Sequence, residues 1–305
     1  MSAPEIRTSF VKANGYQFEV DMCGDGEKLA LCLHGFPEHA ISWRFQLPLL
    51  AKLGYTAWAP NLRGYGRSAR PKGVRAYSAN NLLLDVKALM EVSGKKPSLL
   101  IGHDWGGMLA WTFAMRRLLP LDRLVIFNVP HPRRMAWALK HLPEQRKKSW
   151  YFLYFQIPWL PEWNLARGRA WQIGAIFKKT CRDRTNFTES VLDVYRTSAA
   201  QPGALTAMIN WYRAALHHPA SEWKKSPFID TPTLMIWGEE DTAISKLTAL
   251  GTEEYVRDFT LRFLPGVSHW VQQEAPDAAN AILEAWLTDK PIPEIAPDGR
   301  RITTA

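Results

Sequence analysis

One segment, Leu99–Gly107, restricts what this 305-residue chain can fold into more than any other. It is an apolar run, typical of a buried strand, that passes into the pattern Gly-His-Asp-Trp-Gly, and a helical pattern follows over Gly107–Leu118. Gly102 and Gly106 are expected where a strand turns into a helix so sharply that side chains would clash. Asp104 is therefore predicted at the exposed tip of this turn, with helix N-terminal amides behind it that stabilise negative charge.

Short apolar runs bounded by turn residues recur along the chain and predict further buried strands. These runs are Leu29–Leu33, Thr56–Ala59, Ser98–Ile101, Leu124–Phe127, Thr233–Trp237 and Thr260–Leu264. Helix-length segments such as Asn80–Val92 lie between them, and this alternation predicts a mostly parallel sheet covered on both faces. Asn14-Gly15, between Ser9–Val11 and Gln17–Asp21, predicts a hairpin, so the sheet should begin with antiparallel strands.

The alternation stops near Val129 and resumes at Thr233, and the segment between these points reads as helical. Residues 129–228 contain 16 Lys and Arg against 6 Asp and Glu, whereas the rest of the chain contains 22 against 23. The net charge of +9 therefore belongs to this one segment. We expect a helical cap at 129–228, inserted into an α/β core formed by 1–128 and 229–290. The Pro-rich tail, 291–305, is expected to be loosely ordered.

Composition and motifs exclude several other classes of protein. The basic cap contains no helix-turn-helix, RNP or zinc-finger pattern, so we expect no nucleic acid partner, and pairs such as Lys147-Lys148 predict solvated faces. No apolar run reaches the length of a membrane span, and the N-terminus has no apolar signal region, which makes a cytoplasmic location the default. Cys23, Cys32 and Cys181 fit neither a disulfide framework nor a zinc site. The sequence leaves the oligomeric state open, with a homodimer among the alternatives.

Asp104 at the tip of the turn predicts a carboxylate nucleophile. A carboxylate is already ionised at neutral pH, so it can attack a saturated carbon and form an alkyl ester, which leaves a histidine free to activate water. His269 follows the last predicted strand and is the candidate base. Asp241 follows the preceding strand and would orient the imidazole and stabilise its cation. Glu239 and Glu240 are neighbouring alternatives for that role.

With these residues in view, the chain resembles the epoxide hydrolases of the α/β-hydrolase superfamily. The matching motifs are His34–Glu38, Arg63–Ser68, Gly102–Gly107, Asn128–Pro132, Gly238–Asp241 and Gly266–Trp270. The turn at Asp104 is similar to the superfamily's G-x-S-x-G nucleophile elbow, and the order nucleophile, acid, histidine is that of the same fold. The resemblance implies the α/β-hydrolase fold, favours Asp241 over the two glutamates, and implies an oxyanion hole formed by the amides of Phe36 and Trp105.

The leaving group is the next question, because opening an epoxide produces an alkoxide that needs a proton donor. A tyrosine phenol is neutral and protonated at pH 7 and suits this role. The cap contains Tyr151, Tyr154, Tyr195 and Tyr212. Tyr154, in Leu-Tyr-Phe-Gln-Ile-Pro, is similar to the family's L-Y-F-Q-E-P, and Tyr212, in Asn-Trp-Tyr-Arg, matches N-W-Y-R. The resemblance therefore implies Tyr154 and Tyr212 as proton donors, with Ile157 departing from the family pattern.

The expected reaction is hydrolysis of epoxides to vicinal diols through an ester on Asp104, which requires no metal and no organic cofactor. A dehalogenase with the same nucleophile is the first alternative. Haloalkane dehalogenases usually have Asn where Phe36 stands, and fluoroacetate dehalogenases usually have Arg where Trp105 stands, so both departures count against it. The second alternative is a non-catalytic ligand-binding protein of this fold, against which stands the complete set of candidate catalytic residues.

Overall fold

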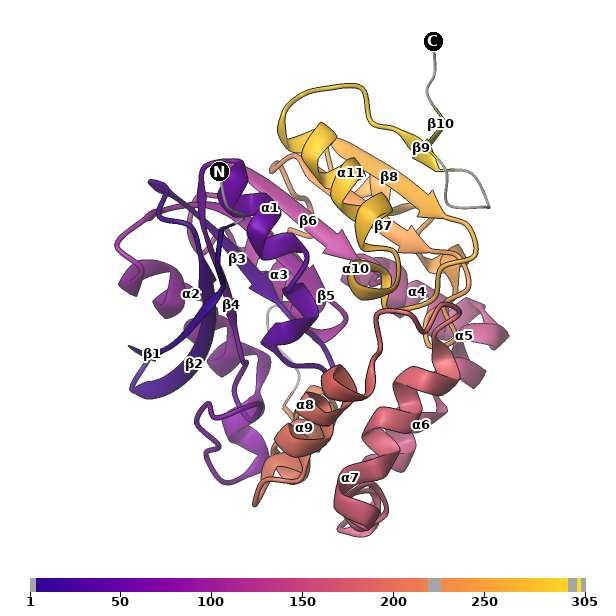
Figure 1. Cartoon of the computed structure of the whole chain (residues 1–305). Coiled ribbons are helices and arrows are strands. Elements are labelled where there is room, and N and C mark those ends of the chain that lie inside the picture. Colours follow the sequence, from indigo (N-terminus) through magenta and orange to yellow (C-terminus); the bar gives the residue numbers. More distant parts are fainter. Residues whose placement is uncertain (1–3, 219–225, 296–300, 303–305) are drawn as a thin grey trace.

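Eight strands form one sheet through the centre of the molecule, as the computed structural model shows (Figure 1). The structure describes residues 4–218, 226–295 and 301–302. The strands are β1 (Arg7–Ala13), β2 (Tyr16–Cys23), β3 (Lys28–Leu33), β4 (Tyr55–Pro60), β5 (Lys96–His103), β6 (Arg123–Phe127), β7 (Thr233–Gly238) and β8 (Phe259–Leu264). Their spatial order is β1-β2-β4-β3-β5-β6-β7-β8. The predicted strands are confirmed, with bounds one or two residues wider than the apolar runs suggested.

The first two strands form the predicted hairpin. Ala13 pairs with Tyr16 across the turn, and Asn14 and Gly15 adopt the positive φ angles of 47° and 74° that such a turn requires. β2 also pairs antiparallel with β4, and every later neighbouring pair in the sheet is parallel. Because the carboxyl ends of β3, β5, β7 and β8 share one edge, the loops that follow these strands are brought together.

Helices cover both faces of the sheet, because alternate residues of each strand point to opposite sides. One face packs on α1 (Gln46–Lys52) and α11 (Pro276–Leu287), where Cys32 lies fully buried in the apolar layer. The other face packs on α2 (Ala79–Val92) and α3 (Trp105–Arg116). The expected mostly parallel sheet between two helical layers is confirmed, and Cys23, Cys32 and Cys181 are free, buried thiols.

The described residues between β6 and β7 are mainly helical, and in Figure 1 most of these helices lie below the sheet. They are α4 (Pro132–His141), α5 (Pro143–Lys148), α6 (Trp150–Tyr154), α7 (Leu160–Thr180), α8 (Glu189–Ala199) and α9 (Ala204–His217). We keep the name cap for residues 129–228. Buried hydrogen bonds join the cap to the core: Trp211 Nε1 donates to the Arg63 carbonyl at 3.0 Å, and the Tyr195 hydroxyl donates to Gln273 Oε1 at 2.6 Å.

The structure describes the C-terminal tail, 291–305, only in part. The tail 291–305 contains the short antiparallel pair β9 (Glu294–Ile295) and β10 (Arg301–Ile302), while its residues 296–300 and 303–305 lie outside the described part. Among the helices that the structure describes, none combines the length and apolar character needed to cross a bilayer.

Candidate active site

Asp104 lies at the junction of β5 and α3, in a backbone conformation that a residue with a side chain rarely adopts. Its φ is 49° and its ψ is −119°, and it is the N-cap residue of α3. The turn requires its glycines: a Cβ on Gly106 would lie 2.1 Å from the Leu33 carbonyl oxygen, and a Cβ on Gly102 would lie 2.5 Å from the Gly106 carbonyl oxygen. Strain of this kind persists only where the surrounding structure enforces it, and it is typical of functional residues.

Two backbone amides, those of Phe36 and Trp105, contact the Asp104 carboxylate. The Phe36 amide donates to Asp104 Oδ1 at 2.8 Å, and the Trp105 amide also hydrogen-bonds the carboxylate. The approach is close because Gly35 has no side chain, and a Cβ there would lie 2.3 Å from that of Asp104. Burial raises the pKa of Asp104, and the cation of His269 and the two amides offset only part of that rise. The structure thus brings Phe36 and Trp105, the residues named from the resemblance, to the candidate nucleophile.

His269 stands on the opposite side of Asp104, and Asp241 holds it in place. His269 Nε2 lies 3.8 Å from Asp104 Oδ2, and His269 Nδ1 lies 2.7 Å from Asp241 Oδ2. Asp241 in turn accepts hydrogen bonds from Asn128 Nδ2 at 2.7 Å and from the amides of Ala243 and Ile244 at 2.7 and 2.8 Å. The pKa of Asp241 is lowered, because His269 and these donors outweigh the opposing effect of burial.

The pKa of His269 is raised to about 9. Burial opposes the imidazolium charge, but the negative charges of Asp241, Asp104 and Glu38 outweigh it. His269 is therefore mostly protonated at neutral pH while Asp104 carries its charge, and anything that removes the Asp104 charge favours the neutral imidazole.

The two glutamates that were alternatives to Asp241 lie elsewhere. Glu239 pairs with Lys246 at 3.0 Å, and Glu240 pairs with Arg182 at 2.8 Å. Both ion pairs are partly exposed, so neither glutamate is placed to orient the imidazole.

A buried polar network lies beside His269, and the sequence motifs did not predict it. Glu38 Oε2 lies 2.7 Å from His103 Nδ1 and accepts from the Gly35 amide at 2.7 Å, while His103 Nε2 lies 2.9 Å from the His269 carbonyl oxygen. Gln272 and Gln273 each donate to Glu38 Oε1 at 2.8 Å. The network fixes the Phe36 loop relative to the His269 backbone. Polar residues just after β3 and at the end of β5, neighbours in a parallel sheet, were the available signal.

A mostly apolar cavity of about 490 Å³ opens in front of Asp104. Its walls include Trp105, Met108, Phe152 and Trp211. A site of this size and composition suits a small lipophilic ligand oriented by a few polar groups.

Two tyrosines, Tyr212 and Tyr151, line this cavity together with Asp104. The Tyr212 ring centroid lies 5.0 Å from that of Trp105 and 5.8 Å from that of Tyr151. Burial raises the pKa of both phenols well above the ordinary value, and the charge of Asp104 adds to the rise. Both hydroxyls therefore stay protonated at neutral pH and remain hydrogen-bond donors.

Tyr154, named from the resemblance, is not among the residues that line this cavity. Its hydroxyl accepts a hydrogen bond from Asn164 Nδ2 at 3.0 Å, and its ring lies beside that of Trp150. α6 presents Tyr151 and Phe152 to the cavity, and Tyr154, its last residue, turns toward α7. The sequence motif predicted Tyr154 as a proton donor, whereas the tyrosine of α6 that lines the cavity is Tyr151, three residues earlier. Tyr195, the fourth cap tyrosine, is bonded to Gln273.

Comparison with known proteins agrees with this geometry. The family model described as the alpha/beta hydrolase fold matches residues 30–276. The chain is 35% identical over 287 residues to the AB hydrolase superfamily protein YfhM of Bacillus subtilis, which covers 93% of this chain and 99% of that protein. It is also 35% identical over 277 residues to epoxide hydrolase 2 of Caenorhabditis elegans, covering 89% of this chain and 77% of that protein.

Solved structures give the same result. The crystal structure of an epoxide hydrolase from Bacillus megaterium in complex with an inhibitor superposes with a TM-score of 0.83 at 27% identity, covering 92% of this chain and 100% of that one. Epoxide hydrolase A from Mycobacterium thermoresistibile superposes with a TM-score of 0.81 at 26% identity, covering 95% and 99% of the two chains.

Proposed function

The chain belongs to the α/β-hydrolase fold family, and from this premise we propose that it hydrolyses epoxides to vicinal diols. One observation supports this most directly: Asp104 and two tyrosines whose phenols stay protonated, Tyr151 and Tyr212, line the same mostly apolar cavity. Nucleophile and proton donors are both needed for an epoxide, whose ring opening makes a carbon–oxygen bond and releases an alkoxide.

In the first step, the epoxide oxygen accepts hydrogen bonds from the two phenols. Asp104 Oδ1 is occupied by the amide of Phe36, so Oδ2 is the oxygen that attacks a ring carbon. The bond between that carbon and the epoxide oxygen breaks, a tyrosine gives its proton to the oxygen, and an alkyl ester forms on Asp104. The apolar walls exclude water and strengthen these interactions.

In the second step, a water attacks the ester carbonyl. Esterification removes the Asp104 charge, which is one of the charges that raise the pKa of His269, so the neutral imidazole becomes available as a base. His269 takes a proton from the water, and Asp241 stabilises the resulting cation. Oδ1 becomes the oxyanion held by the amides of Phe36 and Trp105. Its collapse breaks the ester bond to the diol oxygen, which takes the proton held by His269. The proton left on the Asp104 carboxyl returns to the deprotonated tyrosine, which restores both the carboxylate and the phenol.

The reaction class is tested by assaying the purified protein for two products. We expect diol from a panel of aryl and alkyl epoxides and no halide from haloalkanes or haloacetates. Halide without diol would keep Asp104 and His269 in their roles but refute those of the tyrosines. If neither product forms, the non-catalytic ligand-binding alternative gains support.

The two neighbouring cap tyrosines offer a matched pair of variants. Tyr151→Phe is expected to slow ester formation by roughly 10- to 100-fold, since Tyr212 remains as a donor. Tyr154→Phe removes the same hydroxyl from a side chain bonded to Asn164 and should leave the rate within about twofold of the unmodified protein. The measurement is the single-turnover rate of ester formation, followed by tryptophan fluorescence, and the reverse pattern would restore Tyr154 as the donor.

A further inference from the structure

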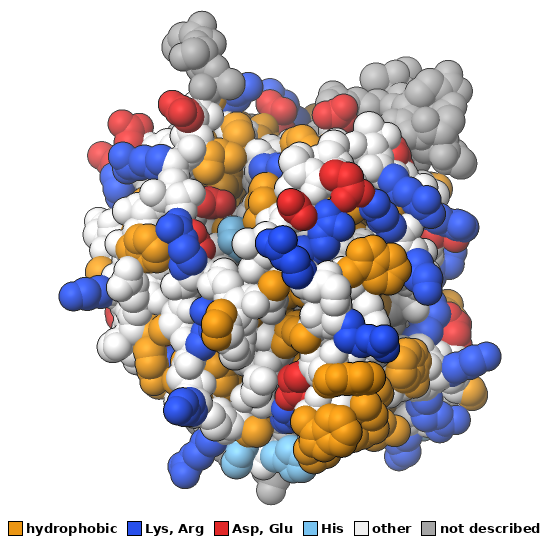
Figure 2. All heavy atoms as spheres, turned by 60° about the horizontal axis from the view of Figure 1, so that its bottom comes forward, with side chains coloured by type: hydrophobic (Ala, Val, Ile, Leu, Met, Phe, Trp, Pro, Cys, Tyr) orange, Lys and Arg blue, Asp and Glu red, His pale blue; other side chains and the backbone are white. Residues whose placement is uncertain are grey.

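The outer surface of the cap exposes large apolar side chains that the core would normally bury. We call the following set the tryptophan face: Trp150, Leu153, Ile157, Trp159, Trp163 and Trp171, which are between 43% and 72% exposed. Figure 2, which turns the cap end of the molecule forward, shows hydrophobic side chains gathered in a patch with Lys and Arg around it. An exposed apolar patch of this kind is typical of a site that binds another protein or a membrane.

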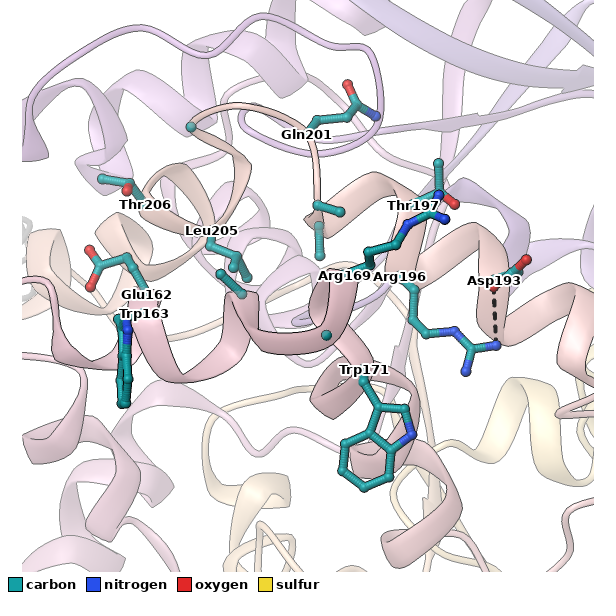
Figure 3. Close-up of a pocket in the computed structure, with 15 residues that line it drawn as sticks. Glu162, Trp163, Arg169, Trp171, Asp193, Arg196, Thr197, Gln201, Leu205 and Thr206 are labelled. Carbon is teal, nitrogen blue, oxygen red and sulfur yellow. Dashed lines mark ion pairs between the residues drawn. The ribbon is translucent and has the colours of Figure 1, made fainter.

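These side chains come from one stretch of chain, residues 150–171, which comprises α6, the linker after it and α7 as far as Trp171. The Trp163 amide donates to the Trp159 carbonyl one turn earlier at 2.9 Å, and Arg213 of α9 fixes the linker by donating to the Ile157 carbonyl at 2.9 Å. In Figure 3, Trp163 and Trp171 both project from α7 toward the same side of the view. α7 is interrupted between them, since residues 167–170 leave the helical conformation.

Positive charge is in excess around the tryptophan face. Residues 143–171 contain five Lys and Arg and two acids. Each acid already neutralises a cation: Glu144 pairs with Lys148 at 3.1 Å, and Glu162 pairs with Arg213 at 2.5 Å. Exposed Arg146, Lys147, Arg167 and Arg169 make up the remaining excess, and the Arg167 guanidinium lies 5.0 Å from the centre of the Trp163 ring.

An open groove of about 1050 Å³ adjoins the face, between α7 and the helices α8 and α9 (Figure 3). Trp163, Arg169 and Trp171 line it. Arg196, on its other wall, is paired with Asp193 at 3.1 Å and Glu189 at 2.7 Å. Arg169 is thus the cation that the groove offers to an incoming anionic group.

We infer that the tryptophan face docks on the surface of an anionic lipid bilayer. Indole rings are amphipathic and favour the boundary between headgroups and hydrocarbon, and neighbouring Lys and Arg are attracted to anionic headgroups. A second copy of the chain fits less well. Two such faces brought together would oppose the same excess of positive charge, and charged residues are depleted at the core of protein interfaces.

Docking would bring the mouth of the catalytic cavity to the membrane. Leu153 belongs to the face and also lines the cavity. Leu216, outside the face, lines the cavity as well and is 51% exposed. A lipophilic substrate could then pass from lipid into the cavity without crossing water. This consequence rests on the proposed function, whereas the docking itself does not.

The test is co-sedimentation of the full chain with vesicles of phosphatidylglycerol and phosphatidylcholine, compared with vesicles of phosphatidylcholine alone. We expect binding to the anionic vesicles that weakens as salt rises. The double variant Trp163→Ala/Trp171→Ala should bind at least about 10-fold more weakly, because two apolar side chains no longer enter the interface. Arg167→Gln/Arg169→Gln should lose roughly 5-fold per cation. Phe10→Ala, an exposed aromatic on β1, is the matched control and should bind like the unmodified protein.

Several outcomes would overturn the inference. One is the absence of binding to anionic vesicles at low salt, and another is unchanged binding by the tryptophan variant with an unchanged melting temperature. A third is a lipid-free dimer, measured by sedimentation velocity, that the tryptophan variant converts to a monomer, since the face would then be a self-interface. Diol formation is assayed in parallel with a water-soluble epoxide, which the tryptophan variant should turn over normally. An unmodified protein that forms diol but does not bind anionic vesicles would therefore refute the docking alone. An unmodified protein that binds the vesicles but forms no diol would refute the proposed reaction alone.

Discussion

Replacing Asp104 by alanine is expected to abolish turnover, with a fall in kcat of at least about 10⁴-fold, the scale seen when a covalent nucleophile is removed. The reason is geometric as well as chemical. Asp104 lies at the tip of the turn between β5 and α3. The amides of Phe36 and Trp105 hydrogen-bond its carboxylate, and the cation of His269 lies close to it. Asp241, the buried carboxylate bonded to His269, already accepts hydrogen bonds from Asn128 and from the amides of Ala243 and Ile244. The measurement is diol formation from the best epoxide of the panel.

Two controls separate loss of chemistry from loss of structure. The melting temperature of Asp104→Ala should stay close to that of the unmodified protein. Glu239→Gln and Glu240→Gln remove the carboxylates that directly precede Asp241 in the chain. Both variants should hydrolyse the epoxide at the normal rate, because these two side chains form partly exposed ion pairs away from His269. A single turnover in ¹⁸O-labelled water adds a direct test of the ester, because the diol oxygen then comes from Asp104 Oδ2 and stays unlabelled. Surviving activity in Asp104→Ala would refute the nucleophile assignment.

The core of the fold was readable from the sequence because its signals are local. Buried parallel strands are continuous apolar runs, and the elbow needs glycine at two fixed positions for steric reasons that do not depend on distant residues. The order of Asp104, Asp241 and His269 along the chain then followed from the order of strands in the sheet. Neither inference needed knowledge of how the cap packs.

The cap limited what could be predicted. Its helices were expected as a group, but the direction of a side chain in a five-residue helix depends on packing against α7 and α9, which the sequence does not encode locally. For this reason the motif predicted Tyr154, and not Tyr151, as a proton donor. The sequence did not predict the Glu38 network for a related reason. Its members come from the loop after β3, the end of β5 and the short helix α10 (Val271–Glu274), and they meet only once the strands are ordered.

Replacing His269 by glutamine is expected to separate the two steps. Ester formation needs Asp104 and the phenols, so it should still occur, while ester hydrolysis loses its base and should slow by roughly 10³-fold. The alkyl-enzyme then accumulates, and intact-protein mass should rise by the mass of one epoxide. Trypsin releases the segment 96–116, which contains Asp104, so the added mass should be found on that peptide. His141→Gln, which changes an exposed histidine of α4, is the matched control and should accumulate no adduct.

The pH dependence of ester hydrolysis tests the role of His269 as the base. In the free protein the pKa of His269 is about 9, and the protonated imidazole cannot accept a proton from water. Ester hydrolysis should therefore accelerate as pH rises, and because esterification removes the Asp104 charge, the inflection should fall below about 9. Single-turnover decay of the alkyl-enzyme across this range measures it. A decay that is independent of pH in the unmodified protein, or a His269→Gln variant that forms no adduct while keeping its fold, would contradict a mechanism in which this histidine activates the water.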